Sequence, residues 1–105
     1  MAQVKFIKHE KEKIPFRISY LSLKNWQGET GKTLADLDQI DTDLALLEPL
    51  FFHAVTVGYN VAGLSNPFTR EELTMILDDC WLEFLNGVGS FFQNGVAQVP
   101  TKKGK

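Results

Sequence analysis

Residues 28–33, with the sequence Gly-Glu-Thr-Gly-Lys-Thr, are the first place to look for chemistry, because they resemble a phosphate-binding loop. Such a loop wraps a phosphate with successive backbone N–H groups and needs a further glycine five residues before its Gly-Lys-Thr. That position is Trp26, and the residues before it have a helical pattern instead of a strand pattern. We therefore interpret Gly31 as a left-handed residue that ends a helix, and not as part of a nucleotide site.

The other reactive side chains do not form a catalytic or metal-binding set in the sequence. His9 and His53 lie 44 residues apart without a spaced cluster of ligands between them, whereas zinc sites take several ligands at close spacing. Cys80 falls on an apolar helical stripe, which favours a core thiol over a nucleophile. Asp78 and Asp79 would point about 100° apart on a helix and so would not converge on one substrate. The sequence predicts no catalytic residue, no metal site and no cofactor.

Length, composition and charge narrow the classes of function further. The chain has 105 residues, 44% of them hydrophobic, which suits one globular domain of ordinary composition. Its net charge of −2 argues against a nucleic-acid partner, because nucleic-acid-binding surfaces are basic. The apolar stretch over residues 44–64 includes Glu48 and Pro49, so we expect a buried helix there and no membrane partner.

Residues 1–18 have the period-two pattern of a β-hairpin. Val4 and Phe6 would share the inner face of the first strand, with Ile7 on its polar face. The inward residues of the second strand would be Ile14, Phe16 and Ile18. Pro15 cannot donate to a ladder, so its strand should be an edge. An isolated hairpin is marginally stable in water, and its apolar face must therefore pack on helices or on a partner.

A first helix is predicted between Ser19, its cap, and about Thr30. Its inward side would carry Tyr20, Leu23 and Trp26. Thr33 and Asp36 then resemble a capping box, which predicts a short acidic helix. The apolar residues of this short helix would be Leu34, Leu37 and Ile40.

The next helix, opening at Asp41 or Thr42, is apolar on nearly every side. A helix of this kind lies at the centre of a fold or between subunits. Pro49 leaves two alternatives open: it kinks this helix, or it is the first-turn proline of a separate helix that starts near Glu48. The apolar surfaces exceed what one core of 105 residues readily covers, so we expect a homo-oligomer.

The last helix carries the clearest signals in the chain. Thr69 and Glu72 form a capping box, and apolar residues then recur at every third or fourth position. Trp81 lies in the middle of this stripe, and we expect it in the core. The helix should loosen near Gly87 and Gly89, since glycine is a poor helix former.

These patterns predict a mainly α fold, with an N-terminal β-hairpin followed by about four helices in a single small domain. The domain would span residues 1–90, and residues 91–105 would form a flexible C-terminal tail. Aromatic side chains on an adaptable segment suit the recognition of a groove or a helix. The candidate partner-binding residues are Phe51, Phe52, Val88, Phe91 and Phe92. The alternative is that Phe91 and Phe92 fold back onto the core.

Several short motifs follow one another in a set order along residues 4–86. They are KIPFRI at 13–18, ETGK at 29–32, a Leu- and Asp-rich turn, an apolar helix over 46–59, NPFT at 66–69 and a helix from Arg70. This order resembles that of the tail assembly chaperones of long-tailed, siphovirus-type bacteriophages. Pro49 departs from the pattern expected for the family.

The resemblance implies a small, non-enzymatic protein of the host cytoplasm that self-associates. Members of the family bind the tape-measure protein and the tail-tube protein during tail assembly, and they are absent from the mature virion. The family has no catalytic motif to transfer to this chain. The alternative from another class is a small structural or adaptor subunit of a phage particle, such as a head–tail joining protein. A DNA-binding regulator is opposed by the acidic balance of the chain.

Overall fold

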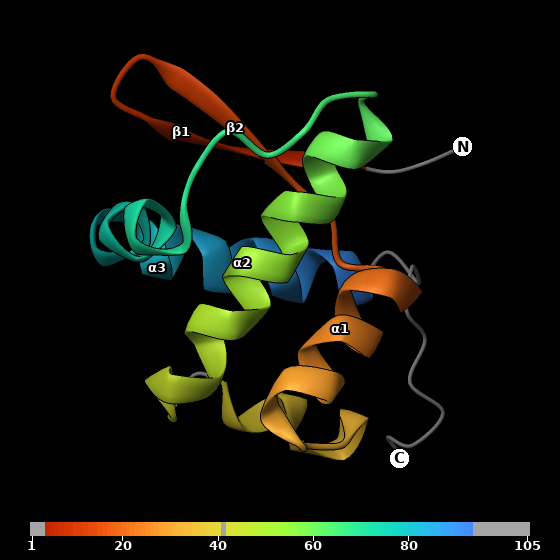
Figure 1. Ribbon diagram of the computed structural model, residues 1–105. Helices are drawn as coiled ribbons and strands as arrows, with labels where there is room; N and C mark the ends of the chain where they lie inside the picture. The colour runs from red at the N-terminus through yellow and green to blue at the C-terminus, as the bar shows by residue number, and fades with distance from the viewer. Residues whose placement is uncertain (1–3, 41, 94–105) are drawn as a thin grey trace.

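The computed structural model describes residues 4–40 and 42–93 (Figure 1). Over this part of the chain the structure is mostly helical, with an antiparallel two-stranded hairpin followed by four helices. The predicted fold class is therefore confirmed. A tail was expected from residue 91 onward. The last helix instead reaches Gln93, so residues 91–93 are helical. The remaining part of the predicted tail, residues 94–105, lies outside the described residues.

The hairpin consists of β1 (Lys5–His9) and β2 (Glu12–Phe16), and its register places Ile7 opposite Ile14. Directly opposed residues of an antiparallel pair share a face, so Ile7 lies inward with Ile14 and is fully buried. Phe6 lies on the outer face with 56% of its surface exposed. The expected inner face of the first strand was therefore wrong by one residue, which is the shift that turns a whole strand over. The inward side of β2 was predicted correctly.

The backbone of β2 lies directly against helix α2 (Leu44–Val61) at Gly58. A Cβ atom at Gly58 would stand 2.7 Å from the carbonyl carbon and oxygen of Pro15, which is too close for any side chain. Beside this contact the Arg17 N–H donates to the Ala54 carbonyl over 3.0 Å. The hairpin is thus fixed to the central helix by backbone contacts as well as by its apolar face.

Helix α1 (Tyr20–Thr30) begins and ends as its sequence predicts. Ser22 Oγ accepts from the Ser19 N–H at 2.8 Å, and Gly31 takes the left-handed conformation with φ of 73°. The glycine at residue 31 therefore ends a helix, as interpreted above. Trp26 is buried and its indole N–H donates to the Leu46 carbonyl at 2.9 Å, which ties α1 to α2. Tyr20 was expected inward but is 78% exposed, because it is the first residue of the helix and lies beyond the packed side.

Thr33 and Asp36 form the predicted capping box, and the short helix η1 (Leu34–Gln39) follows it as a 3-10 helix. The Asp36 carboxylate accepts from the Thr33 N–H at 2.9 Å and from its hydroxyl at 3.1 Å. Leu37 and Ile40 are buried, whereas Leu34 is partly exposed. This turn leads the chain from α1 to the start of α2.

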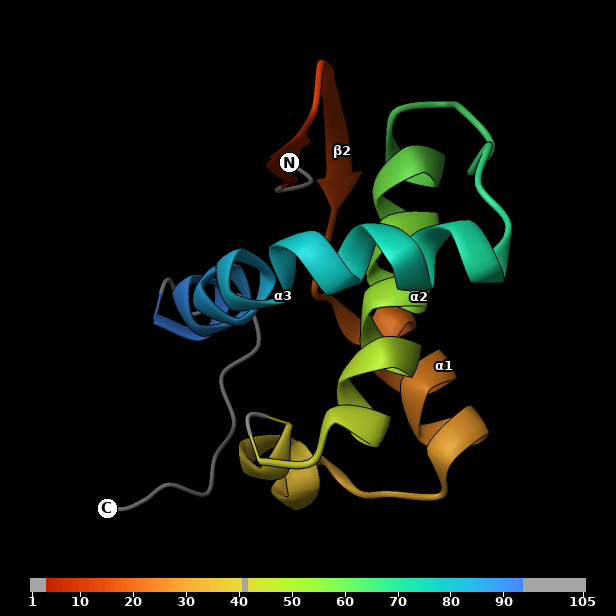
Figure 2. The same ribbon diagram turned by 90° about the vertical axis from the view of Figure 1, so that its left-hand side faces the viewer.

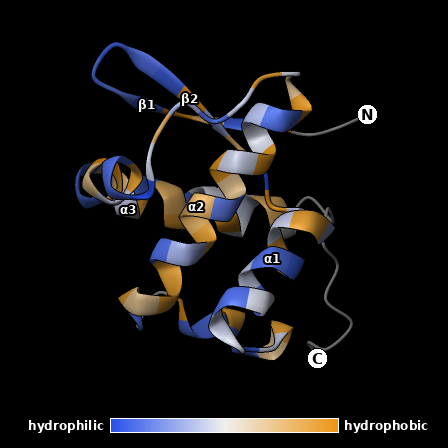
Figure 3. Cartoon of the chain, viewed as in Figure 1, coloured by the Kyte–Doolittle hydropathy of each residue, from blue (hydrophilic) through white to orange (hydrophobic). Residues whose placement is uncertain are grey.

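Helix α2 is the centre of the fold and contacts α1, β2 and α3. Asp43 caps it by accepting from the Ala45 N–H at 3.1 Å, and the helix continues through Pro49. The helix starts before Pro49, so there is no separate helix beginning near Glu48. Hydrophobic residues recur along its length (Figure 3). Among the described helices it alone has the length and hydropathy of a membrane span, and half of it is buried inside this fold, as in a core helix.

Helix α3 (Arg70–Gln93) starts with the predicted capping box. The Thr69 N–H donates to the Glu72 carboxylate at 2.8 Å, and the Glu72 N–H donates to the Thr69 hydroxyl at 3.1 Å. At Cys80 the backbone leaves helical geometry, with φ of −127° and ψ of 19°. This kink divides α3 into a first arm, residues 70–79, and a second arm, residues 81–93, which run in different directions (Figure 2).

The helix was expected to loosen near Gly87 and Gly89, but the second arm stays helical through both residues. The reason is the ring of Phe16. A Cβ atom at Gly87 would stand 2.5 Å from Phe16 Cζ, so the ring packs onto the bare helix at this residue. Phe84 and Phe91 meet the same ring edge to face, with centroids 5.2 Å and 5.7 Å from that of Phe16. Tertiary packing of this kind outweighs the low helix propensity of glycine.

Because Gly58 allows β2 to reach α2, Gly58→Ala should lower the free energy of unfolding by about 1–3 kcal/mol through overpacking against backbone. Gly28→Ala is the matched control, because nothing lies within 4 Å of a Cβ atom at Gly28 inside α1. This second change should stabilise the protein by about 0.5–1 kcal/mol, since alanine favours helix over glycine. Urea denaturation of the two variants measures both effects, and equal free energies would contradict the close approach of β2.

Phe91 is fully buried, so Phe91→Ala should cost about 3–5 kcal/mol of stability, as removal of a large core side chain does. Leu82→Ala is the control on the same arm, because Leu82 is exposed and should change stability by about 0.5 kcal/mol or less. Thermal unfolding followed by circular dichroism compares them. If Phe91→Ala left the melting temperature unchanged, the place of Phe91 in the core would be contradicted.

Candidate functional site

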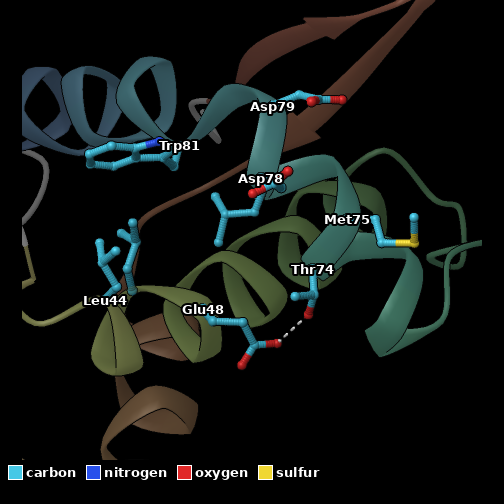
Figure 4. A pocket seen from close by; sticks show the side chains of 9 residues that line it. Leu44, Glu48, Thr74, Met75, Asp78, Asp79 and Trp81 are labelled. Carbon is cyan, nitrogen blue, oxygen red and sulfur yellow. Dashed lines mark hydrogen bonds between the residues drawn. The ribbon is translucent and has the colours of Figure 1, made fainter.

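An open groove lies between the first half of α2 and the first arm of α3 (Figure 4). Its volume is about 510 Å³, within the range typical of ligand sites. The residues that line it are Leu44, Leu47, Glu48, Thr74, Met75, Leu77, Asp78, Asp79 and Trp81. They combine an apolar floor with a carboxylate rim, and they come from two helices that cross each other (Figure 2).

Large apolar side chains of this groove are open to solvent. Leu44 is 55% exposed at the start of α2, and Met75 is 72% exposed on the first arm of α3. Leu47 and Leu77 lie beneath them in the core. Single exposed apolar residues are common on proteins, but a set that gathers around one hollow is typical of a binding surface.

Trp81 lies over the groove because of the kink at Cys80. It is the first residue after the kink, and Figure 4 shows its ring lying flat above Leu44. Trp81 was expected in the core; it packs against the core but is only partly buried. The kink moves the indole from the middle of a straight stripe to the wall of an open groove.

The two neighbouring aspartates of the groove turn in different directions (Figure 4). Asp79 turns toward the hairpin, where its Oδ2 lies 3.0 Å from Nε2 of His9 in β1. Asp78 lies over the middle of the groove and makes no ion pair within the part of the chain that the structure describes. The two carboxylates therefore do not converge, as their adjacent places on a helix predict.

A cluster around Arg70 adjoins the groove at Glu48 and joins three helices. The Arg70 guanidinium binds Glu48 of α2 through two contacts, Nε to Oε2 at 2.6 Å and Nη2 to Oε1 at 3.0 Å. It also binds Glu29 of α1 and lies 4.4 Å from the centroid of the Phe52 ring. Thr74 donates its hydroxyl to Glu48 at 3.1 Å. Glu48 is thus held in place at the rim by groups from α3.

The cluster changes the ionisation of its members. The hydrogen bond from Arg70 holds the pKa of Glu29 below its ordinary value, against the opposing effect of burial, and His53 at 2.8 Å adds to the lowering. The hydrogen bond with Glu48 is the main cause that raises the pKa of Arg70. Both groups are therefore charged at neutral pH, and His53 finds its partner in Glu29.

The predicted partner-binding residues do not form a surface together. Phe51, Val88 and Phe91 are buried in the core, where the rings of Phe51 and Phe84 meet edge to face, so they are core residues. Phe52 is partly buried beneath Arg70. The side chain of Phe92 lies outside what the structure describes.

The groove residues missed by sequence reasoning are Leu44, Met75 and Trp81. One signal could have found Met75: it is a large apolar residue that lies off the main stripe of its helix, where burial is not required. Leu44 has a similar position at the first turn of α2, outside the packed region. The place of Trp81 depends on the kink and has no such signal.

Of the reactive side chains found in the sequence, Asp78 and Asp79 line the groove, whereas His9, His53 and Cys80 do not. Burial raises the pKa of the Cys80 thiol to about 11, and Glu83 and Asp79 act in the same direction, so the thiol is protonated and unreactive at neutral pH. No group of three or more His, Cys, Asp and Glu residues that could hold a metal occurs among residues 4–40 and 42–93.

The lowered pKa of Glu29 predicts an acid dependence of stability. A carboxylate with a lower pKa in the folded state stabilises the fold above its unfolded pKa, near 4.5 here, and this contribution is lost as the pH falls through the folded pKa. The melting temperature of the wild type should therefore fall more between about pH 6 and about pH 3 than that of Glu29→Gln. Asp38→Asn, which removes an exposed carboxylate of η1, controls for the loss of one charge. Parallel curves for wild type and Glu29→Gln would contradict the role of the cluster.

The comparisons with known proteins identify no relative. No family model, no curated protein and no solved structure matches the chain. The function therefore has to be inferred from the residues and their geometry.

Proposed function

We propose that this protein is a non-enzymatic tail assembly chaperone that binds the tape-measure and tail-tube proteins during phage tail assembly. The observation that carries the proposal is the open apolar groove between α2 and α3, with Leu44, Met75 and Trp81 around it. A protein that binds an apolar partner for a limited time needs such a surface. The order of motifs along residues 4–86, which resembles that family, supports the same function.

The size and charge of the protein suit repeated binding along a long partner. One groove of this size supplies modest affinity, but several copies bound side by side on one chain gain avidity. Further apolar side chains, among them Phe6 on the hairpin, stay exposed and could serve contacts between copies in a homo-oligomer. A net charge of −2 opposes binding to nucleic acid, and the proposed place of action is the host cytoplasm.

The test is binding to the tape-measure protein encoded in the same genome, expressed as overlapping segments. The protein should bind one or more segments and keep them soluble. Leu44→Asp should weaken this binding about tenfold or more, because it places a charge on the apolar floor. Leu64→Asp is the matched control, since Leu64 is equally exposed, at 59%, but lies after the other end of α2 and outside the groove.

Two results would contradict the proposal. One is that no segment of the tape-measure protein binds either the wild type or the control variant. The other is stoichiometric incorporation of this protein into purified phage particles, which would instead identify a structural or adaptor subunit.

A further inference from the structure

We propose that the groove between α2 and α3 binds an amphipathic helix whose apolar stripe is flanked by Lys or Arg. This inference rests on the proposed function and adds the chemical character of the partner segment. It follows from the charge of the lining, from the type of its walls and from the contacts that hold Glu48 in place.

The lining of the groove carries one sign of charge. Three of its residues are carboxylates, Glu48, Asp78 and Asp79, and none is a cation. Of these, Asp78 lies over the middle of the groove without an ion pair among the described residues. A hollow lined by one sign of charge concentrates the opposite sign, so a cationic segment is favoured there and an anionic one is repelled.

The cation bound to Glu48 does not offset the negative charge of the lining. Arg70 adjoins the groove at Glu48, but its guanidinium is already bound to Glu48 and to Glu29 and lies over the ring of Phe52. Two carboxylates on one guanidinium leave the cluster with an excess of negative charge. The same contacts fix Glu48, so the rim is arranged before a partner arrives and loses little side-chain entropy on binding.

The walls of the groove favour a helix as the occupant. Both walls are helices, α2 and the first arm of α3, whose backbone hydrogen bonds are made internally, so neither offers a strand edge for an extended peptide. What they offer is side chains: Leu44 and Trp81 toward one end, and Met75 at the other side (Figure 4). An amphipathic helix matches this with apolar residues on one face and charges beside them. Methionine and tryptophan suit such contacts, because one adapts its shape and the other buries a large area.

The experiment uses the full chain and two synthetic peptides of about 18 residues, long enough to form helix. Both carry Leu at every third and fourth position, and the flanking positions are Lys in one peptide and Glu in the other. Emission from Trp81 reports binding, while the buried Trp26 supplies a constant background. The Lys peptide should bind at least about tenfold more tightly than the Glu peptide, and salt should weaken the Lys peptide only.

Two charge variants locate the site. Asp78→Lys should abolish the preference for the Lys peptide, and Asp78→Asn should reduce it. Asp38→Lys is the matched control, because it makes the same change at an exposed residue of η1 outside the groove, and it should keep the preference. Melting temperatures of all variants show that the fold is retained.

Equal binding of the two peptides, no binding of either, or an equal effect of Asp78→Lys and Asp38→Lys would overturn the proposal. A change of oligomeric mass in Asp78→Lys without peptide binding would assign the groove to a second copy of this chain and would also overturn it. Failure here is separable from failure of the chaperone function: tape-measure segments that bind Asp78→Lys as well as the wild type would keep the function and place its surface elsewhere.

Discussion

The contact between the Phe16 ring and Gly87 is the one on which the rest of the structure depends. Since Gly87 has no side chain, the ring reaches the surface of α3 and meets Phe84 and Phe91 edge to face. Gly58 allows the same strand to lie on α2. The hairpin therefore holds the second arm of α3, while the first arm crosses α2 (Figure 2). The kink at Cys80 lets both arms keep these contacts, and the groove lies beside it.

Features fixed by neighbouring residues could be predicted from the sequence. The caps at Ser19, Thr33 and Thr69 and the stop at Gly31 each depend on a hydrogen bond or a φ angle within four residues. The features that were missed depend on residues far apart. Ile7 turns inward because it pairs with Ile14, and the helix passes Gly87 because Phe16 covers it. Local patterns do not contain these partners.

In the candidate site, too, local features could be predicted from the sequence and long-range ones could not. The acidic face of Asp78 and Asp79 was visible in the sequence, but the groove was not, because it needs the kink. Sharp kinks usually occur at Pro, at Gly or Ser pairs or at inserted residues, and residues 77–82 contain no Pro, Gly or Ser. Phe51 and Phe91, which the sequence suggested for partner binding, are core residues for a related reason. A small domain uses its large rings for the core, and the surface is left with Leu44 and Met75.

The pairing of Phe16 with Phe91 also has a consequence for how the chain acquires its fold. The two rings are 75 residues apart in the sequence, so their contact closes a loop that contains most of the described chain. Contacts at such separation form late, because the entropy of a long loop must be lost before they contribute. During synthesis on the ribosome the hairpin would emerge long before its partner on α3. Until residue 91 has left the exit tunnel, the rings of Phe16 and Phe91 cannot meet, and this side of the core stays open.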